Sequence, residues 1–253
     1  MFSDLFVRSI RLETELPGDS YLSRLPILRS LQKMERLDFT KRVTFLVGEN
    51  GTGKSTLIEA LAVNLGFNPE GGSMNFRFST EDSHSELYRY LRVTKGTAIR
   101  RDGFFLRAES FYNVASSIDR MDRIPAPGPR IIEGYGGVSL HKQSHGESFM
   151  ALVKNRFRGS GLYILDEPEA ALSPSRLLEL LCRIHELENQ GSQFIISTHS
   201  PILMAYPGGG VLYLTEQGIA PVSYKETEHY RITKSFLNAP EKMCKYLFEE
   251  EGQ

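Results

Sequence analysis

The chain has 253 residues, enough for one large domain or two small ones. Its 30 Lys and Arg residues nearly balance 31 Asp and Glu residues, and the formal net charge of −1 excludes an overall basic surface for nucleic acid. The sequence contains no apolar run of membrane-spanning length and no apolar signal core at its start, and two cysteines can neither staple a scaffold nor complete a zinc site. We therefore expect a cytoplasmic protein with no membrane insertion.

The first half of the chain opens with an apolar run at 43–47, which predicts a buried strand. A glycine-rich turn follows at 48–53, and the residues after it place their apolar side chains on one helical stripe that ends at Gly66. Further along, the patterns predict a loop at 68–80, a helix at 81–92, a hairpin at 97–107 turning at Asp102-Gly103, a helix at 113–124 and an exposed Pro-rich connection at 125–138.

The second half repeats the order of strand, helix and strand. Residues 162–165 and 194–196 predict strands, and Ser173-Pro174 begins the helix between them, so the two strands should be parallel. The expected apolar face of this helix comprises Leu177, Leu178, Leu181, Ile184 and Leu187. A hairpin follows, formed by 211–214 and 220–224, and residues 226–250 are expected to be mostly helical.

The segment Gly48 to Ser55 fits the phosphate-loop pattern G-x-x-x-x-G-K-[ST] and lies between a predicted strand and a predicted helix. Glycines let several backbone N–H groups point at one anion, and the helix N-terminus adds its positive end. We expect Lys54 to bridge the β- and γ-phosphates and Ser55 to bind Mg²⁺. The residues expected to bind the nucleotide here are Glu49, Asn50, Gly51, Thr52, Gly53, Lys54, Ser55 and Thr56.

Two neighbouring strands end in residues suited to phosphoryl chemistry. The strand at 162–165 is followed by Asp166, which can hold Mg²⁺, and by Glu167, which can orient and polarise a water for in-line attack. His199 follows the next strand, and ligands collect at the carboxyl edge of such sheets. We therefore predict Glu167, His199 and Lys54 as catalytic residues, and Ser55 and Asp166 as metal ligands.

Together these motifs resemble the ABC-type ATPases, in the style of the RecF and SMC branch, and especially a group of small bacterial "predicted AAA-family ATPases". Residues 143–147 resemble the signature motif, 168–173 the Pro and D-loop, and 198–201 the H-loop. The resemblance implies an α/β fold of the P-loop NTPase class, an ABC-type ATPase head with a RecA-like parallel-sheet core. It also implies N-terminal antiparallel β elements and a short helical insertion that carries the signature.

The same resemblance implies a single ABC-type ATPase domain over 1–253. Its nucleotide-binding core would comprise 1–67 and 141–225, with an insertion or helical lobe at 68–140 and a C-terminal helical segment at 226–253. Two such domains would enclose two ATP molecules, with Ser144, Gly146 and Glu147 of one chain facing the phosphate loop of the other. The implied cofactors are ATP and Mg²⁺, and the implied assembly is an ATP-dependent homodimer or a pair with a partner effector protein.

This sequence departs from the family pattern at several positions. The signature has His145 where a glycine is usual and Gln143 where leucine is usual. No glutamine occurs between Lys54 and Gln143 to serve as the Q-loop residue of transporter subunits. Glu109 stands near that place, either as a water or metal contact or as a surface residue. Tyr21 is a candidate for stacking on adenine, but we prefer its interpretation as an ordinary core or surface tyrosine.

Four functions remain open from the sequence. The first is an ATPase that drives a partner in genome maintenance or defence, and the second is a transporter's nucleotide-binding subunit, which the missing Q-loop glutamine disfavours. The third is a DNA-binding head, because residues 89–107 are locally basic, although such a run is usually a solvated face. The fourth is a kinase-like transferase. His229 is assigned no role.

Overall fold

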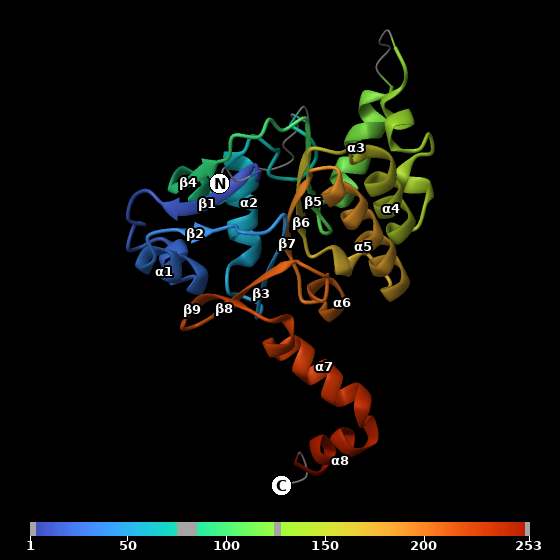
Figure 1. Cartoon of the computed structure of the whole chain (residues 1–253). Coiled ribbons are helices and arrows are strands. Elements are labelled where there is room, and N and C mark those ends of the chain that lie inside the picture. Colours follow the sequence, from blue (N-terminus) through green and yellow to red (C-terminus); the bar gives the residue numbers. More distant parts are fainter. Residues whose placement is uncertain (1–3, 75–84, 124–127, 251–253) are drawn as a thin grey trace.

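The computed structural model describes residues 4–74, 85–123 and 128–250, with the side chain of residue 250 left out (Figure 1). Its centre is a six-stranded sheet of order β5-β6-β7-β3-β8-β9. The first five of these strands are mutually parallel, and β9 pairs antiparallel with β8. The strands are β3 (Val43–Gly48), β5 (Asp102–Arg107), β6 (Gly161–Asp166), β7 (Gln193–Ser197), β8 (Gly210–Thr215) and β9 (Gly218–Val222).

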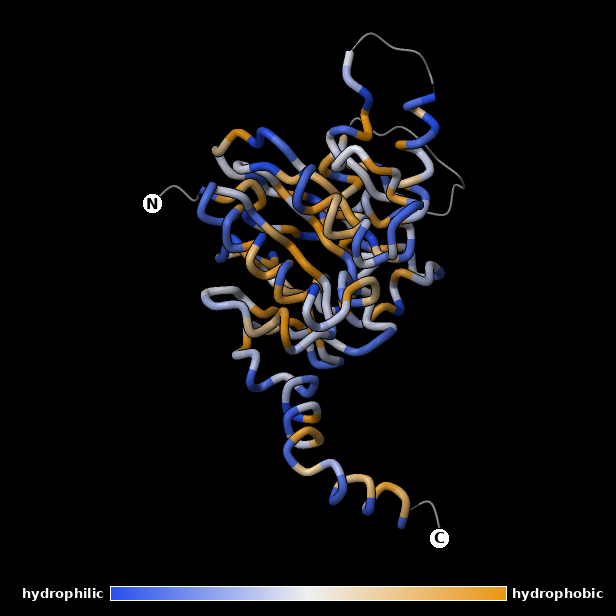
Figure 2. The backbone as a smooth tube through the Cα atoms, turned by 90° about the vertical axis from the view of Figure 1, so that its right-hand side faces the viewer, coloured by the Kyte–Doolittle hydropathy of each residue, from blue (hydrophilic) through white to orange (hydrophobic). Residues whose placement is uncertain are grey.

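The inner strands of this sheet are buried on both faces, which is why their sequences are continuous apolar runs. Alternate residues of each strand contribute to two separate apolar clusters. Tyr163 and Leu165 of β6 belong to one cluster, and Leu162 and Ile164 belong to the other. The central strands appear as apolar tube segments through the middle of the molecule in Figure 2.

Helices cover the two faces of the sheet. The first face packs against α3 (Phe111–Met121), α4 (His145–Arg156), α5 (Pro174–Asn189) and the short α6 (Pro201–Met204). The second packs against α1 (Pro26–Lys33), α2 (Lys54–Asn64) and a small antiparallel sheet of order β2-β1-β4, formed by β1 (Val7–Leu12), β2 (Leu37–Asp38) and β4 (Leu91–Lys95). Short 3₁₀ turns connect these elements at Tyr21–Arg24, Glu86–Arg89, Ile131–Tyr135, Leu140–Lys142, Pro168–Ala170 and Tyr224–Glu226.

The small sheet is joined to the central sheet by one buried amide side chain. Gln193, at the start of β7, is 0 % exposed. Its Nε2 donates to the carbonyl of Val7 at 2.9 Å, and its Oε1 accepts from the amides of Phe6 at 2.8 Å and Val7 at 2.9 Å. These hydrogen bonds pair backbone groups that would otherwise be buried without a hydrogen-bond partner.

The expected strands at 43–47, 162–165 and 194–196, the helices after Gly53 and Ser173, and the C-terminal hairpin are all present. Two expectations between them are wrong. Within the described part of 81–92 the chain forms a 3₁₀ turn and then enters strand β4 instead of an α-helix. Residues 97–107 form no hairpin, because β5 pairs parallel with β6 while β4 lies in the other sheet. Gly103 is inside β5, where an added Cβ would lie 2.8 Å from the ring of Phe67.

Two smaller expectations also need correction. The connection expected to be exposed at 125–138 is partly structured, because Ile132 and Tyr135 are buried against the helices in the part that the structure describes. On α5, Leu178 points to solvent and Leu180 is buried in its place, since the apolar face follows the spacing 177, 180, 184 and 187. Residues 75–80 of the expected loop lie outside the described residues.

The range expected as an insertion, 68–140, contributes one strand to each sheet, β4 and β5, and only the residues after β5 belong to the helical layer. The division of the chain into core, insertion and C-terminal segment stays a prediction.

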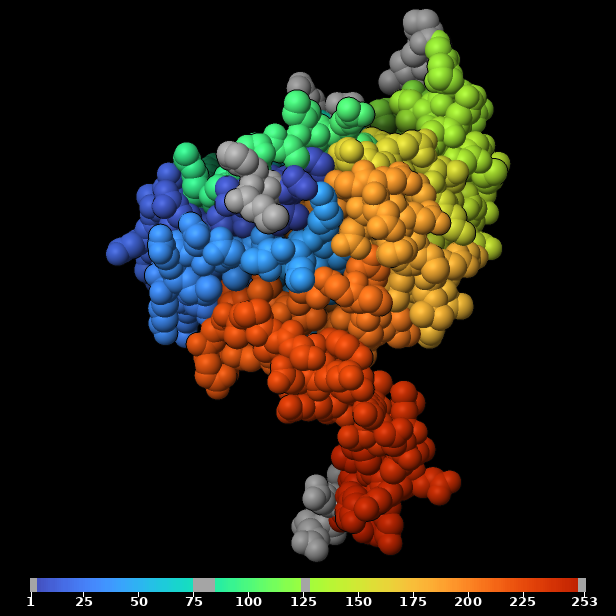
Figure 3. All heavy atoms as spheres, viewed as in Figure 1, coloured from blue at the N-terminus to red at the C-terminus, as the bar shows by residue number. Residues whose placement is uncertain are grey.

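The chain ends in two helices that extend away from the body, α7 (Glu228–Asn238) and α8 (Pro240–Glu250) (Figures 1 and 3). The start of α7 contacts the body at the buried Thr227, whose hydroxyl lies 3.8 Å from Sδ of Met204 on α6. Apolar side chains remain exposed along both helices, including Leu237 and Phe248. No helix in the described ranges has the length and apolar character that a membrane span requires.

Replacing Gln193 by methionine should lower the free energy of unfolding by about 3 kcal/mol. The substitution keeps the shape of the side chain, but it leaves the amides of Phe6 and Val7 and the carbonyl of Val7 without this partner. Chemical denaturation measures the change. The control is Gln190→Met, at an exposed position, which should change stability by less than about 0.5 kcal/mol; equal effects of the two variants would contradict the role given to Gln193.

Candidate functional site

The turn between β3 and α2 has the backbone that an anion-binding loop requires. Gly51 and Gly53 adopt positive φ angles of 79° and 95°, which favour glycine. A Cβ on Gly53 would also lie 2.7 Å from Cγ2 of Ile27, because α1 packs directly against the turn. The amide of Thr52 makes only a long hydrogen bond, of 3.4 Å, to the carbonyl of Glu49. Within the described ranges, no protein acceptor binds the amides of Gly51, Gly53 and Lys54. Several N–H donors at a helix N-terminus are thus available to one anion.

Lys54 begins α2 and is 4 % exposed. Its ammonium donates to the carbonyls of Gly48 at 2.8 Å and Glu49 at 2.9 Å, so the side chain folds back over the loop. Burial lowers the pKa of Lys54, and the nearby carboxylates of Glu167 and Asp166 act in the opposite direction. The ammonium is therefore held by two backbone carbonyl oxygens of the loop, in the field of nearby carboxylates.

The carboxylate of Asp166, at the end of β6, joins three other elements. Its Oδ1 accepts hydrogen bonds from Ser55 Oγ at 3.1 Å and from Ser197 Oγ at the end of β7. Its Oδ2 lies 3.4 Å from Nε of Arg107 at the end of β5. Asp166 is 5 % exposed, so these contacts compensate the cost of burying its charge.

Arg107 is a residue that the sequence interpretation did not place in the site. Besides Asp166 it contacts Glu59 on α2, with NH1 2.6 Å from Oε2, and the exposed fractions of these two side chains are 19 % and 12 %. The basic run at 89–107 is therefore not one solvated face, because Arg107 is internal and Arg100 stacks over the ring of Phe67. No periodic pattern could have revealed this, since the partners come from distant segments.

Glu167 follows Asp166 in a left-handed backbone conformation, with φ 47° and ψ 55°. A non-glycine residue in this region costs about 1 kcal/mol or more, and such strain gathers at functional sites. The amide of Glu167 donates to the carbonyl of Ser197 at 3.1 Å, which holds the turn in place. As a result Oε1 of Glu167 lies 3.4 Å from Nε2 of His199.

The backbone around His199 is fixed by the carboxylate of Glu169. Oε1 of Glu169 accepts from the hydroxyl of Thr198 at 2.8 Å and from the amide of His199. Burial raises the pKa of Glu169, while these hydrogen bonds act to lower it. The segment resembling a D-loop therefore supports the segment resembling an H-loop directly.

His229, on the first turn of α7, was assigned no role from the sequence, yet it contacts the site. Its Nε2 is 2.9 Å from Nδ1 of His199. Burial lowers the pKa of His229, and a protonated His199 beside it would lower it further. The two histidines are 30 residues apart in sequence, and no motif links them.

The segment resembling the signature starts α4, on the other side of the central strands from α2 in Figure 1. Ser144 is the N-cap and forms a capping box with Glu147, whose pKa is lowered by the hydrogen bonds from the Ser144 side chain and amide. Gly146 lies beside the backbone of Ala171, where an added Cβ would be 3.3 Å from the carbonyl oxygen. Within the described ranges, no hydrogen bond or ion pair joins Ser144 or Glu147 to the phosphate loop of the same chain, and the nearest atoms to Gly146 belong to residues 171, 172 and 176.

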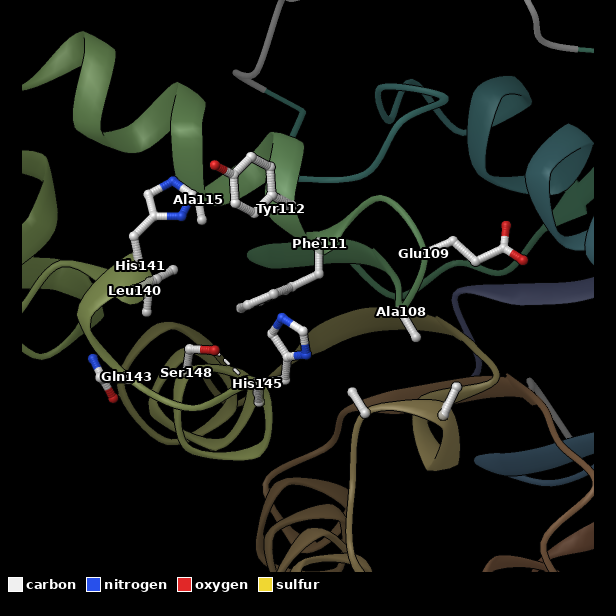
Figure 4. Close-up of a pocket in the computed structure, with 12 residues that line it drawn as sticks. Ala108, Glu109, Phe111, Tyr112, Ala115, Leu140, His141, Gln143, His145 and Ser148 are labelled. Atoms are coloured by element: carbon white, nitrogen blue, oxygen red, sulfur yellow. Dashed lines mark hydrogen bonds between the residues drawn. The ribbon is translucent and has the colours of Figure 1, made fainter.

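A hollow of about 390 Å³ lies beside this signature segment (Figure 4). Phe111 and His145 face its interior, whereas the side chain of Glu109 points away from them. The Glu109 side chain is 86 % exposed and lies 3.8 Å from Arg107, so its charge contacts the site only through that guanidinium. Tyr21 is 56 % exposed. Among the described residues, no contact of its ring supports or excludes a role in stacking on adenine.

Ser55 and Asp166 fit a magnesium ion. A hydroxyl and a carboxylate are the hard oxygen ligands that Mg²⁺ prefers, and their oxygens already lie 3.1 Å apart at the edge of the phosphate loop. The described residues contain no cluster of histidine, cysteine and acidic side chains that would hold a different resident metal.

Two family models match the chain. Residues 28–120 match a model described as "AAA domain", and residues 148–205 match one described as "AAA domain, putative AbiEii toxin, Type IV TA system". The first match contains the phosphate loop, and the second contains Asp166, Glu167 and His199.

Curated relatives carry names of ATP-binding proteins. An "Uncharacterized ABC transporter ATP-binding protein" of Haemophilus influenzae is 26 % identical over 205 residues, which cover 73 % of this chain and 75 % of that protein. The cobalt import ATP-binding protein CbiO of Salmonella paratyphi A is 27 % identical over 207 residues, which cover 76 % of this chain and 73 % of that protein. The chain spans only 39 % to 46 % of the length of three further relatives, among them a protein of Methanosarcina mazei.

Solved structures show the same architecture. An ATP-binding cassette of an ABC transporter superposes with a TM-score of 0.52 at 16 % identity, covering 88 % of this chain and 93 % of that one. The fold is that of an ABC-type ATPase. With the family models and the named relatives, this confirms the expected ABC-type ATPase that uses ATP and Mg²⁺.

Replacing Arg107 by methionine should lower the free energy of unfolding of this ATPase by about 2 to 3 kcal/mol, because Glu59 and Asp166 lose a buried cationic partner. The double variant Glu59→Met/Arg107→Met should recover at least half of the loss, since it removes one of the uncompensated charges. Chemical denaturation of both variants measures the difference.

The matched control is Arg89→Met, which removes an exposed pair with Glu86 and should change stability by less than about 0.5 kcal/mol. A loss in Arg107→Met that is no larger than in Arg89→Met would contradict the internal role of Arg107.

Proposed function

We propose that this chain is an ATP-gated ATPase, which closes as a dimer around ATP and uses slow hydrolysis to drive or switch a partner effector protein. The observation that carries the proposal is the position of Ser144. It caps an exposed helix N-terminus, and in the described residues no hydrogen bond or ion pair links it to the phosphate loop of its own chain, so we infer that a second chain brings the two together. A helix N-terminus with available amides is suited to the terminal phosphate of ATP bound by the partner chain.

Within one chain, the proposed chemistry follows from the contacts at the strand ends. The amides of 51–54 and the ammonium of Lys54 hold the phosphates, and Ser55 and Asp166 hold the metal. Mg²⁺, when bound, supplies positive charge that offsets the charge of the phosphates. Glu167 orients an attacking water and accepts its proton, and His199 lies 3.4 Å from it to contact the terminal phosphate.

Water is the acceptor favoured by this arrangement. Glu167 and His199 place a partly exposed carboxylate and imidazole 3.4 Å apart, which suits the binding of a small nucleophile such as water. We therefore favour hydrolysis over transfer to another molecule.

A partner in genome maintenance or defence fits two features of the chain. The long helical arm of SMC proteins has no counterpart between Ser55 and Ser144, so the head would act on a separate protein. In addition, the family model over 148–205 has a description that names a toxin of a toxin–antitoxin system. Binding to nucleic acid is a weaker proposal, because part of the basic run at 89–107 is engaged inside the fold.

The second candidate is a nucleotide-binding subunit of a transporter. It is favoured by the names of the relatives, which are mostly ATP-binding proteins of transporters. Against it, no glutamine stands between Lys54 and Gln143 to serve as the residue that receives a membrane subunit. Affinity purification with Glu167→Gln and ATP distinguishes the two, because a membrane permease among the captured proteins would favour the transporter.

Glu167→Gln should trap the ATP-bound dimer. The amide keeps the size of the side chain but cannot accept a proton from water, so ATP remains between the chains. Light scattering with Mg-ATP should then give twice the 28.6 kDa mass of the chain, and the variant with ADP should give the monomer mass. A monomer under both conditions, with no other protein present, would refute the homodimer.

The double variant Ser144→Asp/Glu167→Gln should remain monomeric with ATP while it still binds the nucleotide. Aspartate can cap the helix as serine does, but it places a negative charge where the partner's terminal phosphate would lie. Ser144→Asn in the same background is the uncharged control. Equal dimerisation of the aspartate and asparagine variants would count against contact in trans.

Lys54→Ala should lower the affinity for ATP by at least about tenfold, since one buried charge-assisted contact is worth a factor of this size. Calorimetric titration with ATP measures the change, and circular dichroism verifies the fold. Lys33→Ala, at the exposed end of α1, is the control. Unchanged affinity in Lys54→Ala would contradict the assignment of the loop.

A further inference from the structure

We propose that His229 is a positioning residue that donates a hydrogen bond to His199 and thereby keeps the hydrogen of His199 on Nε2, where it faces Glu167 and the terminal phosphate. This inference rests on the proposed function only for the role of His199 in hydrolysis. The hydrogen bond and the tautomer are properties of the chain by itself.

The contact is short and it joins defined atoms. Nε2 of His229 and Nδ1 of His199 are 2.9 Å apart, and the two rings are tilted by 50° at a centroid distance of 5.1 Å. Of two neutral imidazoles in such contact, one donates and the other accepts, and the choice determines the tautomer of both.

The surroundings of His199 favour a hydrogen on Nε2. This nitrogen makes no hydrogen bond in the described structure, but a carboxylate oxygen, Oε1 of Glu167, lies 3.4 Å from it. A ring nitrogen that carried only a lone pair would repel the carboxylate, whereas an N–H is attracted to it. With its hydrogen on Nε2, neutral His199 must accept at Nδ1.

The surroundings of His229 lead to the same assignment independently. Its Nδ1 is buried and has no hydrogen-bond partner among the described residues. A buried N–H without an acceptor is rarer in proteins than an acceptor without a donor, so Nδ1 is the unprotonated nitrogen and Nε2 carries the hydrogen. Burial also lowers the pKa of His229, which keeps the ring neutral and able to make this choice.

The charged groups around the pair are consistent with this arrangement. The carboxylates of Glu49 and Glu228 act to raise the pKa of His229, and the charges of Lys54 and His199 act to lower it. His229 also belongs to the first turn of α7, two residues after the buried Thr227, whose hydroxyl contacts Met204 of α6. The C-terminal helices, which otherwise extend away from the body, thus supply a side chain to the site.

The first test reads the tautomers directly. A two-bond ¹H–¹⁵N spectrum of histidine-labelled protein near pH 8, where imidazoles are neutral, distinguishes Nδ1–H from Nε2–H, and the His199 signals are those lost in His199→Gln. We expect Nε2–H on both His199 and His229 in the unaltered chain. In His229→Leu, His199 should gain a substantial fraction of the Nδ1–H form.

The second test uses a conservative replacement. The amide nitrogen of glutamine can reach the position of histidine Nε2 and donate, so His229→Gln should keep the His199 tautomer and an ATPase kcat within about twofold of the unaltered chain. His229→Leu should lower kcat about tenfold with a KM for ATP changed less than twofold, because only the contact at the terminal phosphate is affected. Arg231→Leu, at an exposed position on the same helix, should change neither the His199 tautomer nor kcat.

These outcomes separate the inference from the function on which it rests. An Nδ1–H tautomer of His199 in the unaltered chain, or an unchanged tautomer in His229→Leu, would overturn the inference whatever the ATPase activity. An equal loss of kcat in His229→Gln and His229→Leu would also overturn it, since the loss would then be structural. Absence of hydrolysis in the unaltered chain would instead refute the proposed function. The tautomer measurement would then still decide whether His229 positions His199.

Discussion

The buried carboxylate of Asp166 is the constraint on which the rest of the site depends. A charge with 5 % exposure is tolerated only where partners compensate it, and here Ser55, Ser197 and Arg107 do so from three different elements. The contacts with Arg107 and Ser197 require the parallel register that places Asp166 opposite both residues. A slip of one residue in either pairing would turn the carboxylate to the opposite face of the sheet.

From this anchor the remaining groups follow in short steps. The chain turns through a left-handed residue at Glu167, which directs its side chain toward His199, and Glu169 then holds the backbone of His199. These groups are thus fixed before any nucleotide arrives, as an electrostatically preorganised site requires. The helix capped by Ser144 belongs to the other side of the sheet, which is the physical reason for our proposal that a second chain completes the site.

The parts of the site that were predictable from sequence are those coded by neighbouring residues. The phosphate loop depends on glycines and a helix start within one short segment, and Asp166 and His199 follow buried strands whose parallel order is dictated by the helix between them. The hairpin expected at Asp102-Gly103 shows where this reasoning fails. The pair is a frequent turn signal, but tertiary packing made Gly103 the one residue of β5 that leaves room for Phe67.

The sequence alone therefore determined the class of fold, the phosphate loop and the acidic strand end, because each is a local pattern with a backbone requirement of its own. The tertiary structure decided what surrounds them. Arg107 lies beside Asp166 and His229 lies beside His199 only because β5 joins the central sheet and α7 returns to it after the last hairpin. Contacts between segments so far apart leave no periodic or compositional trace, since any residue of suitable size and charge could have filled those positions.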